Sequence, residues 1–127
     1  MANFITFPVI GTAAFGGNTA LTVGTSAIID ATTIARVEPL SATTTAVYFN
    51  QSPIANTQKV VLTHTSCVLA VNPITGVNQF PVKDAFIAAL TGNPTTPTVA
   101  LQIPAYVTGT AAAPVYTNVQ IQSGVWS

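Results

Sequence analysis

Short runs in which apolar and polar residues alternate are the dominant pattern of this chain. A period of two is the pattern of a strand with one buried face, and the runs are rich in the Val, Ile and Thr that strands favour. The pattern predicts strands over residues 3–10, 19–23, 27–29, 33–37, 43–49, 59–64, 98–103 and 115–121. Arg36 and Glu38 lie two apart on one of these strands, so we expect them to pair on its exposed face.

The middle of the chain predicts a strand pair. Residues 43–49 and 59–64 are both dense in strand-forming types, and the loop between them contains Pro53. We expect the two strands to be antiparallel, with a register that a loop of this length does not define. Cys67, Leu69 and Val71 continue the alternation of the second strand, and residues 72–76 have the composition of a turn.

One segment has the period of a helix instead. Val82, Phe86 and Leu90 recur at intervals of four with alanines between them, and Asp84 suits the positive end of the helix dipole. Gly92 and Pro94 supply a stop, so a single short helix is predicted over 82–91.

The two ends of the chain differ from its middle. Pro8 cannot donate to a strand ladder, which favours an edge strand or an extended arm over residues 1–18; the alternative is a first strand that covers its own core. In residues 94–127 the polar faces carry Thr, Asn and Gln instead of charges, so these strands need a partner or a cover. The runs at 98–103 and 115–121 are expected to form a hairpin or two arm strands.

These patterns together predict a mainly β fold of the α+β class. We expect a small antiparallel β-sandwich or barrel with one short helix and extended N- and C-terminal arms. The predicted organisation is an N-terminal arm or edge strand at 1–18, a β-rich core at 19–93 and a C-terminal β-hairpin or arm at 94–127.

The low fraction of charged residues is the most informative feature of the composition. Only 5% of the 127 residues are charged, against roughly 25% in an ordinary soluble domain, and the formal net charge is zero. All six charged side chains lie between residues 30 and 84. Since little electrostatic repulsion keeps copies apart, we expect much of the surface to be covered by partners in an oligomer or a mixed assembly.

The prolines and the single cysteine argue against two further features, a membrane-spanning helix and an internal disulfide. The uncharged C-terminal residues contain Pro94, Pro97, Pro104 and Pro114, so no membrane-spanning helix is expected, and the N-terminus lacks the pattern of a secretory signal. Cys67 has no cysteine partner within the chain, so stability has to come from packing.

The chemistry-bearing residues do not form a recognisable set. His64 and Cys67 are three apart, which in a continuous strand places them on opposite faces and excludes joint metal ligation or a nucleophile and its base. Ser66 beside His64 lacks the strand-to-helix elbow of a hydrolase. No phosphate loop is present, and three basic residues are too few for nucleic acid. We expect no enzyme activity, no cofactor and no metal.

Four stretches, at 28–38, 43–45, 59–65 and 83–94, follow one another in an order that resembles small capsid-associated proteins of tailed bacteriophages, of the decoration or cement type. The resemblance covers about residues 20–94. It implies a structural role at the capsid surface, without catalytic residues, in a protein made in the host cytoplasm.

The leading hypothesis is therefore a virion structural protein that binds the major capsid protein and copies of itself and stabilises the shell. The alternatives are a tail, fibre or extracellular filament subunit and, in another class, a small-ligand binding module. Aromatic residues in the uncharged ends are the expected contact residues: Phe4, Phe7, Phe15, Tyr106, Tyr116 and Trp126.

Overall fold

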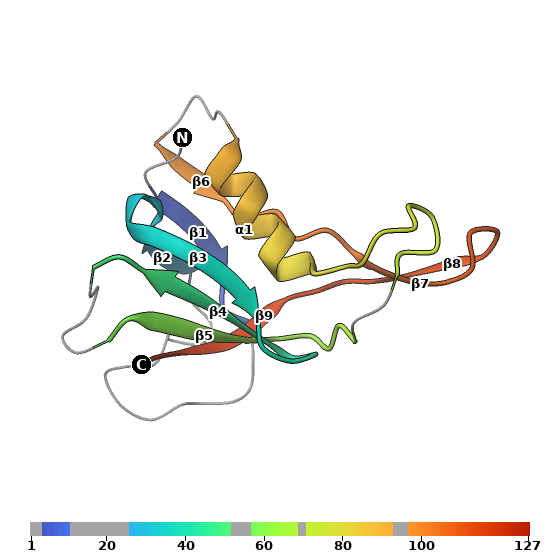
Figure 1. Cartoon of the computed structure of the whole chain (residues 1–127), viewed down its shortest axis with the longest axis horizontal. Helices are drawn as coiled ribbons and strands as arrows, with labels where there is room; N and C mark the ends of the chain where they lie inside the picture. Colours follow the sequence, from blue (N-terminus) through green and yellow to red (C-terminus); the bar gives the residue numbers. More distant parts are fainter. Residues whose placement is uncertain (1–3, 11–25, 52–56, 69–70, 93–96) are drawn as a thin grey trace.

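The computed structural model describes residues 4–10, 26–51, 57–68, 71–92 and 97–127 (Figure 1). Within them the fold is mainly β with one α-helix, and the sheets are open, so the predicted class is confirmed without a closed barrel. The strand predicted at 19–23 lies outside the described residues. The elements in chain order are β1 (Phe4–Pro8), β2 (Ser26–Asp30), η1 (Ala31–Thr33), β3 (Ile34–Pro39), β4 (Thr44–Phe49), β5 (Lys59–His64), α1 (Pro81–Thr91), β6 (Thr98–Ala100), β7 (Tyr106–Gly109), β8 (Pro114–Thr117) and β9 (Ile121–Trp126).

Strand β1 is the central strand of a three-stranded sheet with the order β2-β1-β6. It runs antiparallel to β2 and parallel to β6, and its alternation buries Ile5 and Phe7. Pro8 is the last residue of the strand, opposite Ser26, where the ladder ends and a missing N–H is tolerated. Over residues 4–8 the structure therefore shows the alternative, a first strand that covers its own core, and not an arm or edge strand.

The second sheet has the order β3-β4-β5-β9 and is antiparallel throughout. The predicted pairing of β4 with β5 is confirmed, with Thr44 opposite Thr63 and Tyr48 opposite Lys59. Strand β9 completes this sheet and buries Ile121, so the last strand of the chain belongs to the core and not to an arm.

The outer strand β3 carries the expected ion pair. Arg36 Nη2 lies 3.7 Å from Glu38 Oε2, and both side chains are exposed. An exposed pair of this kind contributes about 0–1 kcal/mol. Charges on an edge strand, together with Pro39 at the end of β3, also disfavour pairing with another sheet.

Helix α1 confirms the predicted helix to within a residue. Pro81 occupies the first turn, and Asp84 Oδ2 accepts a hydrogen bond from the N–H of Phe80 at 3.4 Å. The helix ends where the N–H of Gly92 bonds to the carbonyl of Ala88. Among its buried side chains, Phe86 packs on β1, where its ring meets that of Phe7 edge-on with 6.0 Å between centroids, while Pro81 and Val82 face the β3–β4 turn.

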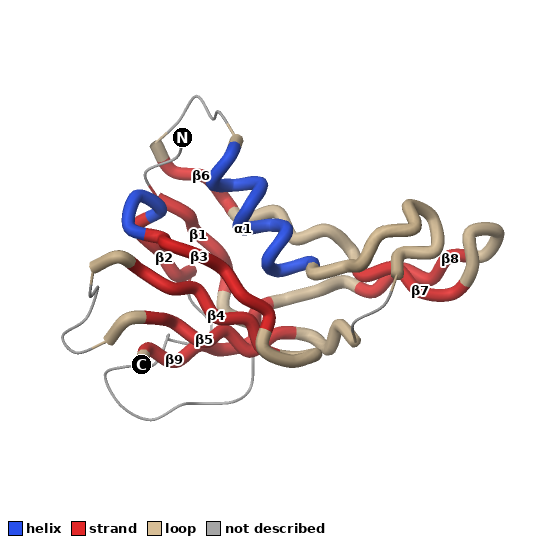
Figure 2. The backbone as a smooth tube through the Cα atoms, in the orientation of Figure 1, coloured by secondary structure: helices blue, strands red, loops and turns tan. Residues whose placement is uncertain are grey.

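Strands β7 and β8 form a two-stranded sheet of their own, which leads away from the rest of the molecule (Figures 1 and 2). We call residues 106–117 the hairpin extension. Residues 98–103 and 115–121 do not pair with each other: β6 pairs with β1, and the hairpin in the C-terminal part forms between β7 and β8. A four-residue turn brings β7 and β8 together locally, helped by Gly109, whose φ of +83° suits a residue without a Cβ.

Candidate functional site

The six predicted contact aromatics have different surroundings. Phe7 and Tyr106 are buried within the chain, so they are corrected from contact residues to core residues. Trp126 is half-buried against Phe49, with 5.4 Å between ring centroids. Phe4 is 42% exposed and Tyr116 is 62% exposed. Phe15 lies outside the described residues.

The hairpin extension exposes apolar side chains on both of its faces. Val115 is 56% exposed, and its neighbour Tyr116, which points to the opposite face of the strand, is exposed to a similar degree. The loop at 71–78, which leads into α1, adds further exposed aliphatic residues. We define the extension surface as the exposed side chains of Val68, Val71, Ile74, Val77, Val115 and Tyr116. None of the six charged residues of the chain belongs to it.

Gln79 attaches the extension to the body of the molecule. Its Nε2 donates to the carbonyl of Val107 at 2.7 Å, and its Oε1 accepts from the N–H of Val107 at 2.8 Å. Both residues are buried, so the amide side chain takes the place of a neighbouring strand. The hydroxyl of Tyr106 also donates to the carbonyl of Val68 at 2.5 Å. The extension is therefore held out from the body by directed bonds at its base.

These bonds also limit how a partner can approach. Gln79 occupies the outward backbone groups of Val107 on β7, and Pro114 on β8 has no N–H to offer. Strand addition would therefore be hindered at Val107 on β7 and at the missing N–H of Pro114 on β8. Val115 and Tyr116 are the large exposed apolar side chains of the extension.

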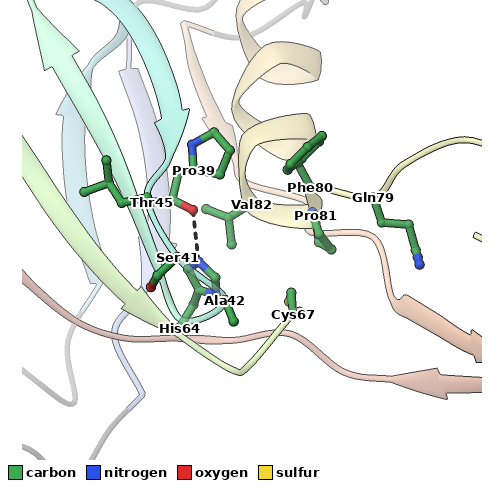
Figure 3. A pocket seen from close by; sticks show the side chains of 11 residues that line it. Pro39, Ser41, Ala42, Thr45, His64, Cys67, Gln79, Phe80, Pro81 and Val82 are labelled. Atoms are coloured by element: carbon green, nitrogen blue, oxygen red, sulfur yellow. Dashed lines mark hydrogen bonds between the residues drawn. The ribbon is translucent and has the colours of Figure 1, made fainter. Parts of the chain in front are cut away.

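A cavity of about 250 Å³ lies between the β3–β4 turn, the end of β5 and the start of α1 (Figure 3). His64 and Cys67 both line it, which corrects the expectation that they lie on opposite faces. The reason is that β5 ends at His64 and the chain bends at Thr65, after which the N–H of Cys67 bonds to the carbonyl of Ala42 at 2.7 Å. Sequence alternation alone does not reveal such a bend.

The hydrogen bonds of His64 and the protonation of Cys67 nevertheless make both side chains weakly reactive. His64 Nδ1 lies 2.8 Å from the carbonyl oxygen of Thr65, which can only accept, so we assign the ring proton to Nδ1. Nε2 then accepts from the hydroxyl of Thr45 at 2.9 Å. Burial raises the pKa of the Cys67 thiol, which keeps it in the weakly nucleophilic protonated form. The described residues contain no group of three or more His, Cys, Asp or Glu that could hold a metal ion.

Acidification below pH 6.5 should destabilise the protein through His64. Burial lowers the pKa of His64 below its ordinary value of 6.5, against a smaller opposing effect of the Thr65 carbonyl. The unfolded chain then binds more protons than the folded one, so this stabilisation is complete above pH 6.5 and is lost as the pH falls towards the lowered pKa. Urea midpoints measured between about pH 7.5 and pH 5 should fall for the wild type and stay level for His64→Gln. Equal slopes for the two proteins would contradict the assignment.

Comparison of the chain with protein-family models, with curated proteins and with solved structures gives no match. Across the part of the chain that the structure describes, no helix is both long enough and apolar enough to cross a membrane.

Proposed function

We propose that this chain is a structural subunit of a large protein assembly and that it attaches through the hairpin extension. The observation that carries the proposal is the extension itself: a two-stranded sheet held away from the body, uncharged, with Val115 and Tyr116 exposed on opposite faces.

A free two-stranded hairpin is only marginally stable in water, because it has no second layer to cover its side chains. Here the bonds from Gln79 and the buried Tyr106 secure the base, while the outer part has no cover among the described residues. The central part of a protein interface is depleted in charge and enriched in Tyr, which matches this composition. A preformed extension also loses little conformational entropy on binding.

The charge on strand β3 also supports attachment through the extension. The charged strand β3 presents Arg36 and Glu38 to solvent at the edge of the second sheet. Association by edge-to-edge pairing is disfavoured at that strand. This leaves attachment through the side chains of the extension surface as the proposed mode, although Ile28 on the body is exposed to a similar degree.

We further propose that the assembly is a viral shell, in which the chain binds the major capsid protein as a decoration or cement protein. Support for this step comes from the resemblance of residues 20–94 to small capsid-associated phage proteins and from the low charge of the chain. A tail, fibre or filament subunit would use the same extension.

A small-ligand binding module has less support. The cavity beside His64, of about 250 Å³, is smaller than the roughly 300–1,000 Å³ of most ligand pockets, whereas a hollow of about 770 Å³ beside Tyr48 and Lys59 lies within that range. Both ring nitrogens of His64 are already bonded within the protein, so this residue has no polar group left to orient a ligand.

Quantitative mass spectrometry of purified particles tests the proposed function. The chain should be present at a fixed ratio to the major shell protein, and labelled protein should decorate the shell in micrographs. Label confined to the tail or to filaments would favour the alternative assembly. Absence of the chain from every particle fraction would overturn the viral role.

A further inference from the structure

We propose that this chain binds an acidic oligosaccharide in the hollow beside Tyr48 and Lys59, with Lys59 facing the acidic group of the sugar and the side-chain amides of Asn50, Gln51 and Gln58 facing its hydroxyls. This site is separate from the hairpin extension and goes beyond the proposed role as an assembly subunit.

The hollow lies where β4 ends and β5 begins. Its volume of about 770 Å³ is within the roughly 300–1,000 Å³ of ligand pockets. The residues that line it are Tyr48, Phe49, Asn50, Gln51, Thr57, Gln58, Lys59 and Ser127. Among these described residues most are polar, three are amides, and Lys59 alone has a charged side chain.

The backbone that carries the amides is already held in place. The N–H of Asn50 donates to the carbonyl of Thr33 at 2.7 Å. Gln58 is bonded on both sides, because its carbonyl accepts from the N–H of Phe49 at 2.9 Å and its N–H donates to the carbonyl of Ser127 at 2.8 Å. Both amide residues are exposed. An amide donates and accepts hydrogen bonds, as a sugar hydroxyl does, and a fixed backbone reduces the entropy lost on binding.

Positive charge gathers at the same place. Arg36, Tyr48 and Lys59 are cross-strand neighbours on β3, β4 and β5. The guanidinium carbon of Arg36 lies 4.1 Å from the centre of the Tyr48 ring, and Lys59 Nζ lies 5.7 Å from it. Arg36 is paired with Glu38, whereas Lys59 has no salt bridge among the described residues, which include all three acidic side chains of the chain. A carboxylate or sulfate on the ligand would supply the missing counter-charge.

The covered aromatic rings favour a saccharide over a nucleotide. Arg36 and Lys59 lie at the ring of Tyr48, and Phe49 is buried and packs on Trp126 with 5.4 Å between ring centroids. Single-stranded nucleic acids are held largely by stacking of bases on open aromatic faces. A saccharide that is bound through its hydroxyls and its acidic group does not need such a face.

The hollow and the hairpin extension lie at opposite ends of the molecule. The end of β4 and the start of β5 are on the left in Figure 1, and β7 and β8 are on the right. A subunit attached through its extension would therefore keep the hollow open to a ligand outside the assembly. This last step rests on the proposed function, and the binding site itself does not.

The test is a titration of the full-length protein with uronic-acid, sialylated and sulfated oligosaccharides, each beside a neutral counterpart of the same length. At least one acidic member should bind with a Kd below about 1 mM and at least about tenfold more tightly than its neutral counterpart. Its affinity should fall as salt is added, because the contact to Lys59 is electrostatic.

Variants then assign the contacts. Lys59→Gln should weaken binding of the acidic member at least about tenfold, and Gln58→Ala about two- to tenfold. Lys83→Gln is the matched control, since Lys83 also lies over an aromatic ring, with its Nζ 5.3 Å from the centre of the Phe80 ring, and does not line the hollow. It should keep the wild-type affinity, and urea midpoints should show that all three variants are folded.

Failure of every acidic oligosaccharide to bind would overturn the site, and so would equal affinity for the neutral counterparts. A folded Lys59→Gln variant that binds like the wild type would overturn the role of Lys59. The proposed function fails separately. A chain present in particles at fixed copy number that binds no saccharide would lose this site and keep its role as a subunit, and a chain that binds and is absent from particles would lose the viral role and keep the site.

Discussion

Replacement of Phe86 by Ala should lower the free energy of unfolding by about 3–5 kcal/mol. Phe86 is fully buried, and its ring meets Phe7 of β1 edge-on, so the substitution leaves a cavity where α1 packs on the first sheet. A helix of 11 residues is too short to be stable alone and depends on this packing. Urea denaturation followed by circular dichroism measures the loss.

The neighbouring Ile87 is a matched control, because it lies on the exposed side of the same helix. Ile87→Ala should change the free energy of unfolding by less than about 1 kcal/mol. If Phe86→Ala cost no more than Ile87→Ala, the placement of α1 against β1 would be wrong.

Replacement of Gln79 by Ala should destabilise the protein by about 2–6 kcal/mol and loosen the hairpin extension. The substitution leaves the buried N–H and carbonyl of Val107 without the partners that Gln79 supplies, and each unsatisfied group costs about 1–3 kcal/mol. Gln79→Glu should also destabilise, because a carboxylate cannot donate to the Val107 carbonyl. Urea denaturation and amide hydrogen exchange at Val107 measure the two effects.

Gln102 provides the control for this prediction, since it is an exposed glutamine in the same uncharged part of the chain. Gln102→Ala should leave both stability and exchange at Val107 close to the wild-type values. Unchanged protection of Val107 in Gln79→Ala would show that Gln79 does not hold the extension.

The local elements were predictable because each is encoded within its own segment. The spacing of Val82, Phe86 and Leu90 predicted α1, and alternation predicted β2 to β5 to within a few residues. The partners of the outer strands were not predictable, because they come from distant parts of the chain. Phe4 pairs with Thr98 across almost the whole sequence, and no local pattern encodes that choice.

Of the aromatic residues that the sequence proposed as contacts, the structure shows which are exposed and which are buried. Low charge near the C-terminus indicated a surface made for partners, and Tyr116 lies on the extension. Phe7 and Tyr106 are as aromatic as Tyr116, and only the fold shows that they are buried. Gln79 carries no motif or periodicity, so its bonds to Val107 become visible only when the two residues are brought together.

The central claim is that the chain associates through the extension surface, and light scattering over a concentration series tests it most directly. Val115→Lys and Val77→Lys place one charge on that surface, and Ile28→Lys places the same charge on β2 at a residue that is 66% exposed. The wild type and Ile28→Lys should both rise above the monomer mass as concentration increases, while Val115→Lys and Val77→Lys should remain monomeric. Loss of association in Ile28→Lys, or association of the extension variants equal to that of the wild type, would contradict the account.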